Sequence, residues 1–272
     1  MADVLTTRSG RVKAARKLTR RRDRAEHRLF LAEGAKALSE ALLVSGCVVE
    51  VFATAAATSS YDALREAVTA AGSPWHVAED AAVAALSGTV APQGVVTVCR
   101  FVDVPLGELV AADGFLAVCA DVRDPGNAGT VIRSADAAGA AGVVLAGHSV
   151  DLYNDKTVRA TVGSLFHLPM ALQTDPGGAV RRLQGAGWTV LAADAAGERG
   201  LFGADTEALL GGKVAWLFGN EAWGLPDVLA ELADHRVAIP IFGRAESLNL
   251  STAAAVCLYA TARARLGCDP SA

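Results

Sequence analysis

Residues that could bind or transform a ligand gather in three polar loops, each of which follows an apolar, strand-like segment. The first lies in ADVRDPGNAGTVIRSADAAG, where a helix is expected to begin near Asn127 and to carry Arg133 among alanines. A helix N-terminus at the carboxyl end of a strand is a natural anion site. Asparagine is also a common helix cap, and an arginine inside a helix is often a solvated surface residue. This loop alone leaves both interpretations open.

The second and third loops supply further polar groups. In VAWLFGNEAWGLP an apolar strand runs into Gly219, Asn220 and Glu221, and the glycine permits close backbone approach to a ligand. In VAIPIFGRAESLNLSTAAAV a strand is followed by Ser247 and Asn249, just before a helix of small residues. Either Asn249 or a nearby serine could cap that helix. The capping interpretation does not explain all three loops together.

The elements that must position these loops alternate between strands and helices. Helices are expected at 129–138, 178–184 and 251–266, and strands at 115–122, 142–146, 165–172, 189–193, 214–218 and 237–241. Such alternation predicts a parallel sheet covered on both faces. Because knots are rare, these patterns by themselves favour an open, doubly wound sheet.

The first part of the chain is predicted to form a smaller α/β unit. Its expected elements are helices at 34–44 and 61–71 and strands at 48–53, 75–77 and 95–101. The stretch DVPLGELVAADG contains a proline and two glycines and is the best candidate for a connection. We therefore assign residues 1–103 to one domain, 104–112 to a linker and 113–272 to a second domain.

Charge is distributed unevenly along a chain whose overall net charge is −4. Residues 1–32 hold ten basic and three acidic side chains, a net charge of +7, which leaves −11 for the remainder. A basic segment on an acidic protein points to local contact with a polyanion such as a phosphate backbone, and the segment expected to make that contact runs from Arg8 to Arg28. A solvated helix face is the alternative, but five arginines between Arg20 and Arg28 favour nucleic acid, because guanidinium groups pair well with phosphates.

Several classes of protein are disfavoured. The chain has no GxGxxG, GxxxxGK[ST] or GxSxG motif, which argues against a dinucleotide site, a P-loop and a hydrolase elbow. The five cysteines form no CxxC pair and the five histidines are scattered, so we predict reduced thiols and no metal site. No apolar run approaches the roughly 18 residues of a membrane span, and the N-terminus lacks the apolar core of a secretory signal. We therefore expect a cytoplasmic protein.

The three loops, in this order, resemble the signature motifs of the SpoU (TrmH-type) family of SPOUT RNA methyltransferases. DPGNAGTVIRSADAAG is similar to the first motif, LFGNEAWGLP to the second and IPIFGRAESLNLSTAAAV to the third. The resemblance covers roughly residues 113–266. The first half, through KLTRRRDRAEHRLFLAEG and SGTVAPQGVVTV, resembles the family's substrate-binding domain, which is similar to RNA-binding ribosomal proteins. The family fold implies an α/β SPOUT domain with a C-terminal trefoil knot instead of an open sheet.

The resemblance also implies the chemistry, which is methylation of a ribose 2'-oxygen in RNA with S-adenosyl-L-methionine as the cofactor. The family's polar active-site positions correspond to Asn127, Arg133, Glu221, Ser247 and Asn249. The implied cofactor-binding residues are Leu217, Gly219, Asn220, Glu221, Ile239, Ile241, Gly243, Ser247, Leu248 and Asn249. Members usually act as homodimers with the active site near the subunit interface.

Some choices stay open at this level. The N-terminal domain favours 23S ribosomal RNA over transfer RNA as substrate, with either ribosome maturation or antibiotic resistance as the purpose. A non-catalytic RNA-binding protein is disfavoured because every active-site position is occupied by the expected residue. Arg133 is often assigned as the base in this family. A guanidinium with a pKa above about 12 is seldom neutral, however, so stabilising developing charge is the physically easier role.

Overall fold

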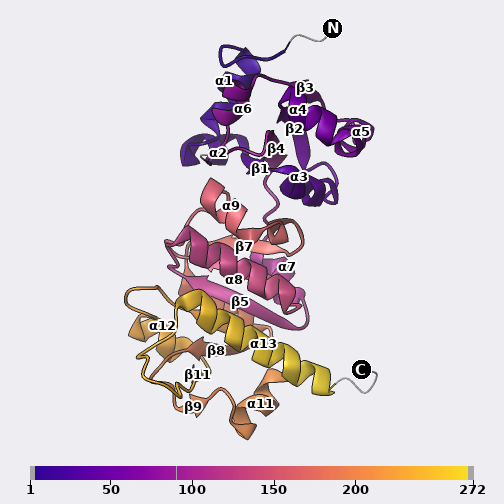
Figure 1. Ribbon diagram of the computed structural model, residues 1–272. Coiled ribbons are helices and arrows are strands. Elements are labelled where there is room, and N and C mark those ends of the chain that lie inside the picture. The colour runs from indigo at the N-terminus through magenta and orange to yellow at the C-terminus, as the bar shows by residue number, and fades with distance from the viewer. Residues whose placement is uncertain (1–3, 90, 269–272) are drawn as a thin grey trace. The chain divides into compact units, whose positions relative to one another are not determined.

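The chain folds into two compact units, which Figure 1 shows as ribbons. The computed structural model describes residues 4–89 and 91–268. Unit 1 consists of residues 1–102 together with residues 151–167, and unit 2 consists of residues 103–150 and 168–272. A segment from the middle of the chain thus belongs to the N-terminal unit, a division that differs from the expected boundaries.

Unit 1 is built on a four-stranded sheet with the strand order β1-β4-β2-β3. The strands are β1 (Leu29–Glu33), β2 (Val48–Ala53), β3 (Trp75–Val77) and β4 (Val95–Arg100). Strand β4 is antiparallel to both of its neighbours, and β2 and β3 are parallel. The helices are α1 (Gly10–Lys17), α2 (Arg21–His27), α3 (Ala35–Leu42), α4 (Ala55–Ser60), α5 (Asp62–Ala70), α6 (Asp80–Ala84), α9 (Asp155–Thr161) and the 3-10 turn η1 (Ser164–Phe166).

Aromatic packing explains why residues 151–167 belong to unit 1. The ring of Phe30 on β1 lies 4.7 Å from that of Tyr153 and 6.1 Å from that of Phe166, measured between centroids. Phe101 stacks on Tyr153 at 3.7 Å. The strand expected at 165–172 is therefore wrong over its first half. Those apolar side chains fill the core of unit 1 as part of η1, and only Met170–Gln173 forms a strand, β7.

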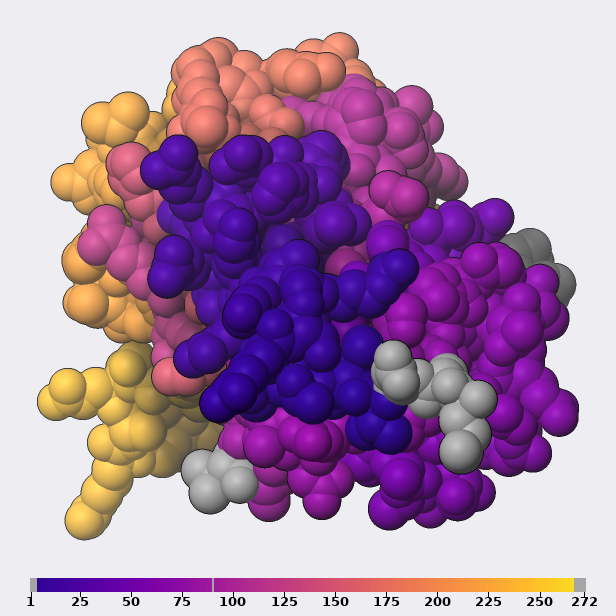
Figure 2. Space-filling view, turned by 90° about the horizontal axis from the view of Figure 1, so that it is seen from above, coloured from indigo at the N-terminus to yellow at the C-terminus, as the bar shows by residue number. Residues whose placement is uncertain are grey.

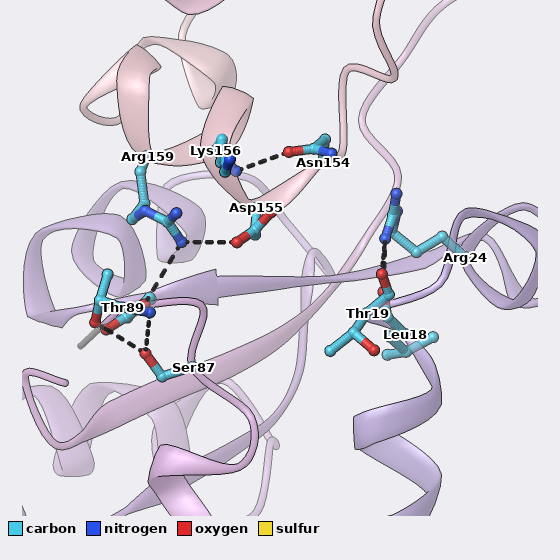
Figure 3. Close-up of polar contacts among 10 residues, drawn as sticks. Leu18, Thr19, Arg24, Ser87, Thr89, Asn154, Asp155, Lys156 and Arg159 are labelled. Atoms are coloured by element: carbon cyan, nitrogen blue, oxygen red, sulfur yellow. Dashed lines mark hydrogen bonds and ion pairs between the residues drawn. The ribbon is translucent and has the colours of Figure 1, made fainter. Parts of the chain in front are cut away.

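Arg24 of helix α2 has a structural role within this unit. Its guanidinium donates to the backbone oxygens of Leu18 and Thr19, both at 2.9 Å, as the close-up in Figure 3 shows. The same group pairs with the carboxylate of Asp151 at 2.6 Å, and the Arg24 side chain is only 6% exposed. Arg24 therefore ties α2 to the segment that begins at Asp151. Within that segment, Arg159 of α9 pairs with Asp155 at 3.1 Å.

Unit 2 contains a seven-stranded, all-parallel sheet with the order β7-β6-β5-β10-β8-β11-β9. The other strands are β5 (Phe115–Ala120), β6 (Gly142–Ala146), β8 (Thr189–Ala193), β9 (Arg199–Gly200), β10 (Val214–Phe218) and β11 (His235–Ala238). Almost every residue of the central strands β5 and β10 is fully buried, as their continuous apolar sequences require. The predicted parallel α/β fold is confirmed.

Helices cover both faces of this sheet. Helices α8 (Pro125–Ala137) and α13 (Leu250–Cys268) lie side by side on one face of the sheet, where Figure 1 draws α8 in magenta and α13 in yellow. Helix α11 (Ala204–Leu210) contacts α13. On the other face, α7 (Leu106–Ala111), α10 (Pro176–Gly185) and α12 (Asp227–Leu232) pack around a common apolar core. The indole of Trp216 on β10 donates to the hydroxyl of Thr261 on α13 at 2.8 Å, a buried link between sheet and helix.

Two further segments differ from the sequence-based expectations. Residues 104–112, expected to be a linker, contain helix α7, whose Leu106 and Leu109 are buried in the core of unit 2. The strand expected at 237–241 ends at Ala238, and an irregular segment then continues to the start of α13. Pro240 has no backbone N–H to donate, and Gly243 permits a turn. The segment after Ala238 therefore does not continue the hydrogen-bond ladder of the sheet.

Candidate active site

The three polar loops meet at the carboxyl ends of neighbouring parallel strands. The first follows β5, the second follows β10 and the third follows β11, while Asp194 lies directly after β8. Carboxyl ends of parallel strands meet at one edge of the sheet, which is where ligands of open α/β folds bind. A cleft of about 450 Å³ lies there, a volume typical of small-molecule sites. It is lined by Ala193, Asp194, Ala195, Phe218, Gly219, Asn220, Glu221, Gly224, Val237, Ile239, Ile241, Glu246, Ser247, Leu248, Asn249, Leu250 and Ala253.

The first loop starts helix α8 earlier than expected. Asp124 caps the helix by accepting the N–H of Asn127 at 2.7 Å, and Pro125 occupies the first helical position. Asn127 is therefore not the cap, and its side chain is available for the site. Its amide donates to the carboxylate of Glu221 at 3.3 Å, and its carbonyl oxygen accepts from the amide of Asn249 at 3.1 Å. One residue from each loop thus takes part in a single polar chain.

Glu221 holds the first and second loops together. Its carboxylate accepts the backbone N–H groups of Arg123 at 3.3 Å and Asp124 at 3.1 Å, besides the amide of Asn127. Three N–H donors are thus directed at one carboxylate. Burial raises the pKa of the nearby Cys119 thiol to about 12, and the charge of Glu221 adds to this rise. Cys119 is therefore a protonated core residue and not a nucleophile.

Asn220 organises the turn that carries Glu221. Its side-chain amide donates to the backbone oxygen of Asp121 at 2.7 Å, and its side-chain oxygen accepts the N–H of Ala222 at 2.8 Å. Two backbone hydrogen bonds between Asn220 and Gly224 close the turn. A Cβ on Gly219 would lie 2.3 Å from the carbonyl carbon of Gly224. The glycine is thus required by the turn itself, in addition to lining the cleft.

The third loop ends in a local cap at the start of α13. The side-chain oxygen of Asn249 accepts the N–H of Ser251 at 2.9 Å and its hydroxyl at 2.7 Å. The capping interpretation of Asn249 therefore holds for its oxygen, while its amide reaches Asn127. Ser247 and Leu248 line the cleft beside it. One side chain thereby fixes the helix start and joins the polar chain.

Four of the predicted residues lie outside the cleft lining. One of them, Asn127, is joined to the lining residues Glu221 and Asn249 by hydrogen bonds. Leu217 is fully buried in β10, where its side chain belongs to the core that packs on α10 and α12. Gly243 lies in the exposed part of the third loop. Arg133 is exposed on α8 and forms no hydrogen bond or ion pair with another described residue. It shares an exposed stripe of that helix with Gly126, Thr130 and Ala137.

Residues that the sequence reasoning missed add negative charge and backbone geometry to the site. Asp194 and Glu246 line the cleft. Asp121, directly after β5, has a left-handed backbone with a φ of 57°, and its carboxylate accepts the N–H of His148 at 2.6 Å. Their position in the sequence could have identified Asp121 and Asp194 as site residues. Each directly follows the end of a strand, at the same edge of the sheet as the three loops.

The basic segment predicted to contact nucleic acid forms a continuous surface of unit 1, shown in indigo in Figure 2. Helix α1 buries Val12 and Ala15 and exposes its basic residues. A shallow hollow of about 460 Å³ is lined by Lys13, Arg16, Lys17, Thr19 and Arg20. Arg24, in contrast, is buried and structural. In residues 4–89 and 91–268 there is no cluster of potential metal ligands and no helix long and apolar enough to cross a membrane.

Comparison with known proteins agrees with this architecture. The model of the SpoU rRNA Methylase family matches residues 114–259, and that of the MRM3-like substrate binding domain matches residues 10–97. The chain is 32% identical to the 23S rRNA (guanosine(2553)-2'-O)-methyltransferase RlmP of Bacillus subtilis, over 95% of the chain and 98% of that protein. The chain belongs to the SpoU rRNA methylase family. The family prediction is therefore confirmed.

Other family members extend the comparison. The chain is 38% identical to the 23S rRNA (uridine(2479)-2'-O)-methyltransferase of Streptomyces viridochromogenes, over 65% of the chain and 62% of that protein. The AdoMet-bound rRNA methyltransferase from Sinorhizobium meliloti is similar in structure, with a TM-score of 0.83, 32% identity and coverage of 96% of this chain and 97% of that one. AviRb from Streptomyces viridochromogenes, in complex with AdoMet, gives a TM-score of 0.83 at 30% identity, covering 95% and 99% of the two chains.

Proposed function

We propose that this SpoU-family protein methylates a ribose 2'-oxygen of 23S ribosomal RNA, with S-adenosylmethionine as the methyl donor. The observation that carries the proposal is the polar chain Asn249–Asn127–Glu221, which joins all three family motifs at the rim of one cleft. Relatives named as 23S rRNA 2'-O-methyltransferases, one of them similar over nearly the whole chain, support the reaction and the substrate.

The cleft suits this cofactor in size and in charge. Ile239, Ile241 and Leu248 offer apolar surface for an adenosine group, and the bends of the second and third loops bring backbone groups to the lining. Asp194 and Glu246 supply negative charge that complements a sulfonium and an ammonium group. When bound there, S-adenosylmethionine would supply an activated methyl group. Solved structures of similar proteins with AdoMet bound support this assignment.

The chain's own residues would then orient the RNA. Asn127 and Asn249 present amide groups near the cleft, where they can position a ribose. Ser247 can position the 2'-hydroxyl group of that ribose. Glu221 fixes the second loop against the first by accepting the backbone N–H groups of Arg123 and Asp124. The guanidinium of Arg133 would hold a phosphate and stabilise negative charge on the attacking oxygen.

We further propose a homodimer in which a second copy completes the site. Arg133 does not line the cleft of its own chain, although it lies on the same helix as Asn127. The exposed stripe of α8 adjoins exposed Tyr259 and Leu266 of α13, beside a hollow of about 830 Å³. The phenolic oxygen of Tyr259 lies 3.5 Å from the backbone oxygen of Ala137, so the two stripes form one surface. A second copy on this surface would bury exposed apolar area and bring its Arg133 toward the cleft.

Four further expectations belong to the same proposal. The exposed basic residues of α1 and α2 would contact the RNA backbone. The irregular segment between β11 and α13 would pass through a neighbouring loop as a trefoil knot. A ribosomal RNA substrate implies action in the cytoplasm. The boundary of the substrate-binding part would lie near residue 103, with residues 151–167 returning to it.

The direct test is methyl transfer from labelled S-adenosylmethionine to unmodified 23S ribosomal RNA and, separately, to transfer RNA, with the product mapped by mass spectrometry. We expect label on a ribose of 23S RNA, and mapping will identify the base, which differs between the two relatives. Label on transfer RNA alone would overturn the substrate, and absence of both label and cofactor binding would overturn the enzyme assignment. Arg133→Ala should abolish turnover, whereas Arg182→Ala, which replaces an exposed arginine of α10 on the other face of the sheet, should not.

Mixing two inactive variants tests the dimer. Arg133→Ala and Asn249→Ala are expected to be inactive alone and to regain activity when co-expressed, because a mixed dimer contains one site with both residues intact. No recovery in a verified mixed dimer would show that Arg133 acts within its own chain.

A further inference from the structure

An exposed tryptophan stands beside the polar chain of the active site. Trp223 lies in the turn between Asn220 and Gly224, and 54% of its surface is exposed. The other tryptophans differ: Trp188 and Trp216 are buried and Trp75 is half-buried. An exposed indole at the rim of a cleft leaves a large flat apolar surface in water, and such surfaces often mark binding sites.

A cation covers part of the Trp223 ring. The guanidinium carbon of Arg123 lies 5.0 Å from the ring centroid, within the range of a cation–π contact. Arg123 forms no ion pair with any acidic side chain in the described part of the chain, so its charge is available to an external anion. The pair thus combines an aromatic face with a free positive charge.

Both members of the pair are held by the same frame. The backbone N–H of Arg123 donates to Glu221, and Trp223 lies two residues beyond Glu221 in a turn closed by two backbone hydrogen bonds. The turn is further fixed by the amide of Asn220 on the backbone oxygen of Asp121. Little conformational freedom of the backbone would therefore be lost when a ligand binds to the pair.

We propose that Trp223 and Arg123 form a stacking platform for a nucleotide next to the ribose that is methylated. This inference rests on the proposed function and names a substrate-positioning element for the same site. One base of an unpaired RNA strand stacks on the open face of the indole, and Arg123 pairs with an adjacent phosphate. The ligand class is single-stranded RNA of little sequence preference, because every base has a π face.

The expected effect follows from the strength of such stacking. Removal of one base–aromatic stack weakens single-strand binding by about 1–3 kcal/mol, which is roughly 5- to 150-fold. The effect should fall on RNA affinity and on the KM for RNA, and not on the affinity for S-adenosylmethionine. Removal of the Arg123 charge should lower the slope of log K against log salt by about 0.7, the contribution of one contact to a single-strand phosphate.

The experiment uses the full chain and a single-stranded 12-nucleotide RNA of random sequence, without cofactor. RNA is expected to quench tryptophan fluorescence in the unchanged protein, and Trp223→Phe should lose most of that quenching. Trp223→Ala should weaken RNA binding 5- to 150-fold, with Trp223→Phe intermediate. Phe202→Ala is the matched control, because Phe202 has nearly the same exposure, 55%, and lies between β9 and α11, outside the three polar loops.

Two results would overturn the platform. One is unchanged RNA affinity in Trp223→Ala. The other is a shift of Trp223→Ala from dimer to monomer in sedimentation with RNA affinity retained at equal dimer concentration, which would assign the indole to contact between copies. Because binding and quenching are measured without methyl transfer, their outcome is independent of the reaction. Loss of quenching in Trp223→Phe together with no methylation of any RNA would leave Trp223 as a stacking site for single-stranded RNA and remove the proposed function.

Discussion

Replacing a buried arginine of helix α2 should affect a different property of the protein from replacing an exposed arginine of the same helix. Arg24 is buried, donates to two backbone oxygens and pairs with Asp151. Arg21 and Arg22, in the same helix, are exposed. We expect Arg24→Met to destabilise unit 1 and Arg21→Met to weaken RNA binding, although each change removes one positive charge from the same basic segment.

The magnitude for Arg24 follows from what the replacement leaves behind. The Asp151 side chain is only 15% exposed and would lose its charged partner, and the backbone oxygens of Leu18 and Thr19 would lose a donor. Breaking a buried pair by removing one member costs about 3–5 kcal/mol, because the remaining charge stays buried and unpaired. Methionine retains much of the apolar stem, so lost packing adds little. An exposed replacement such as Arg21→Met should change the free energy of unfolding by no more than about 0.5 kcal/mol.

The assay must resolve the two units, since a two-unit chain need not unfold in one step. Hydrogen exchange read by mass spectrometry should show lower protection in α2 and in residues 151–167 for Arg24→Met, and unchanged protection in the sheet of unit 2. RNA binding measured at several salt concentrations should show a weaker affinity and a shallower salt dependence for Arg21→Met.

The reasoning would be refuted if Arg24→Met kept wild-type protection in residues 151–167, because the pair with Asp151 would then carry no stability. It would also be refuted if Arg21→Met lowered protection as much as Arg24→Met does. Asp151→Asn is a useful second variant. It should destabilise less than Arg24→Met, since the amide oxygen can still accept a hydrogen bond from the guanidinium.

Three further predictions concern single groups. Glu221→Ala removes the acceptor of two backbone N–H groups, and a hydrogen bond to a charged group contributes about 1.5–3 kcal/mol. This variant should lower single-turnover methyl transfer by at least tenfold. Unchanged turnover would contradict the role of Glu221 in holding the loops. The hydrogen bond from His167 holds the pKa of Glu40 below its ordinary value of 4.5, so its stabilisation is fully present above pH 4.5 and is lost as the pH falls through the lowered native pKa. Glu40→Gln should therefore lower the Tm at pH 6 and lose this effect toward pH 3, and equal Tm differences at both pH values would argue against it. The Cys119 thiol, fully buried and with a pKa of about 12, should resist a thiol reagent at pH 8 until the protein unfolds; labelling at the rate of an exposed thiol would contradict its burial.

The sequence alone determined the chemistry because the relevant groups lie in three contiguous segments. Each segment combines a buried strand with a polar loop, and apolar runs such as those of β5 and β10 predict parallel strands at the centre of a sheet. The structure decided two points that the sequence left open. Asp124, not Asn127, caps α8, and Gly219 is required by its own turn. Both depend on contacts within a few residues that several side chains could have made.

Only the tertiary structure decided which distant residues meet. The hydrogen bonds of Asn127 to Glu221 and Asn249, and the pair of Arg24 with Asp151, join residues far apart in the chain. Periodicity shows which face of an element is apolar, but not which core that face joins. Residues 165 and 166 therefore resembled a strand of unit 2, although they fill the core of unit 1. The physical reason is that burial stabilises an apolar side chain in any well-packed core, and the order of the strands, which no local pattern records, selects the one it enters.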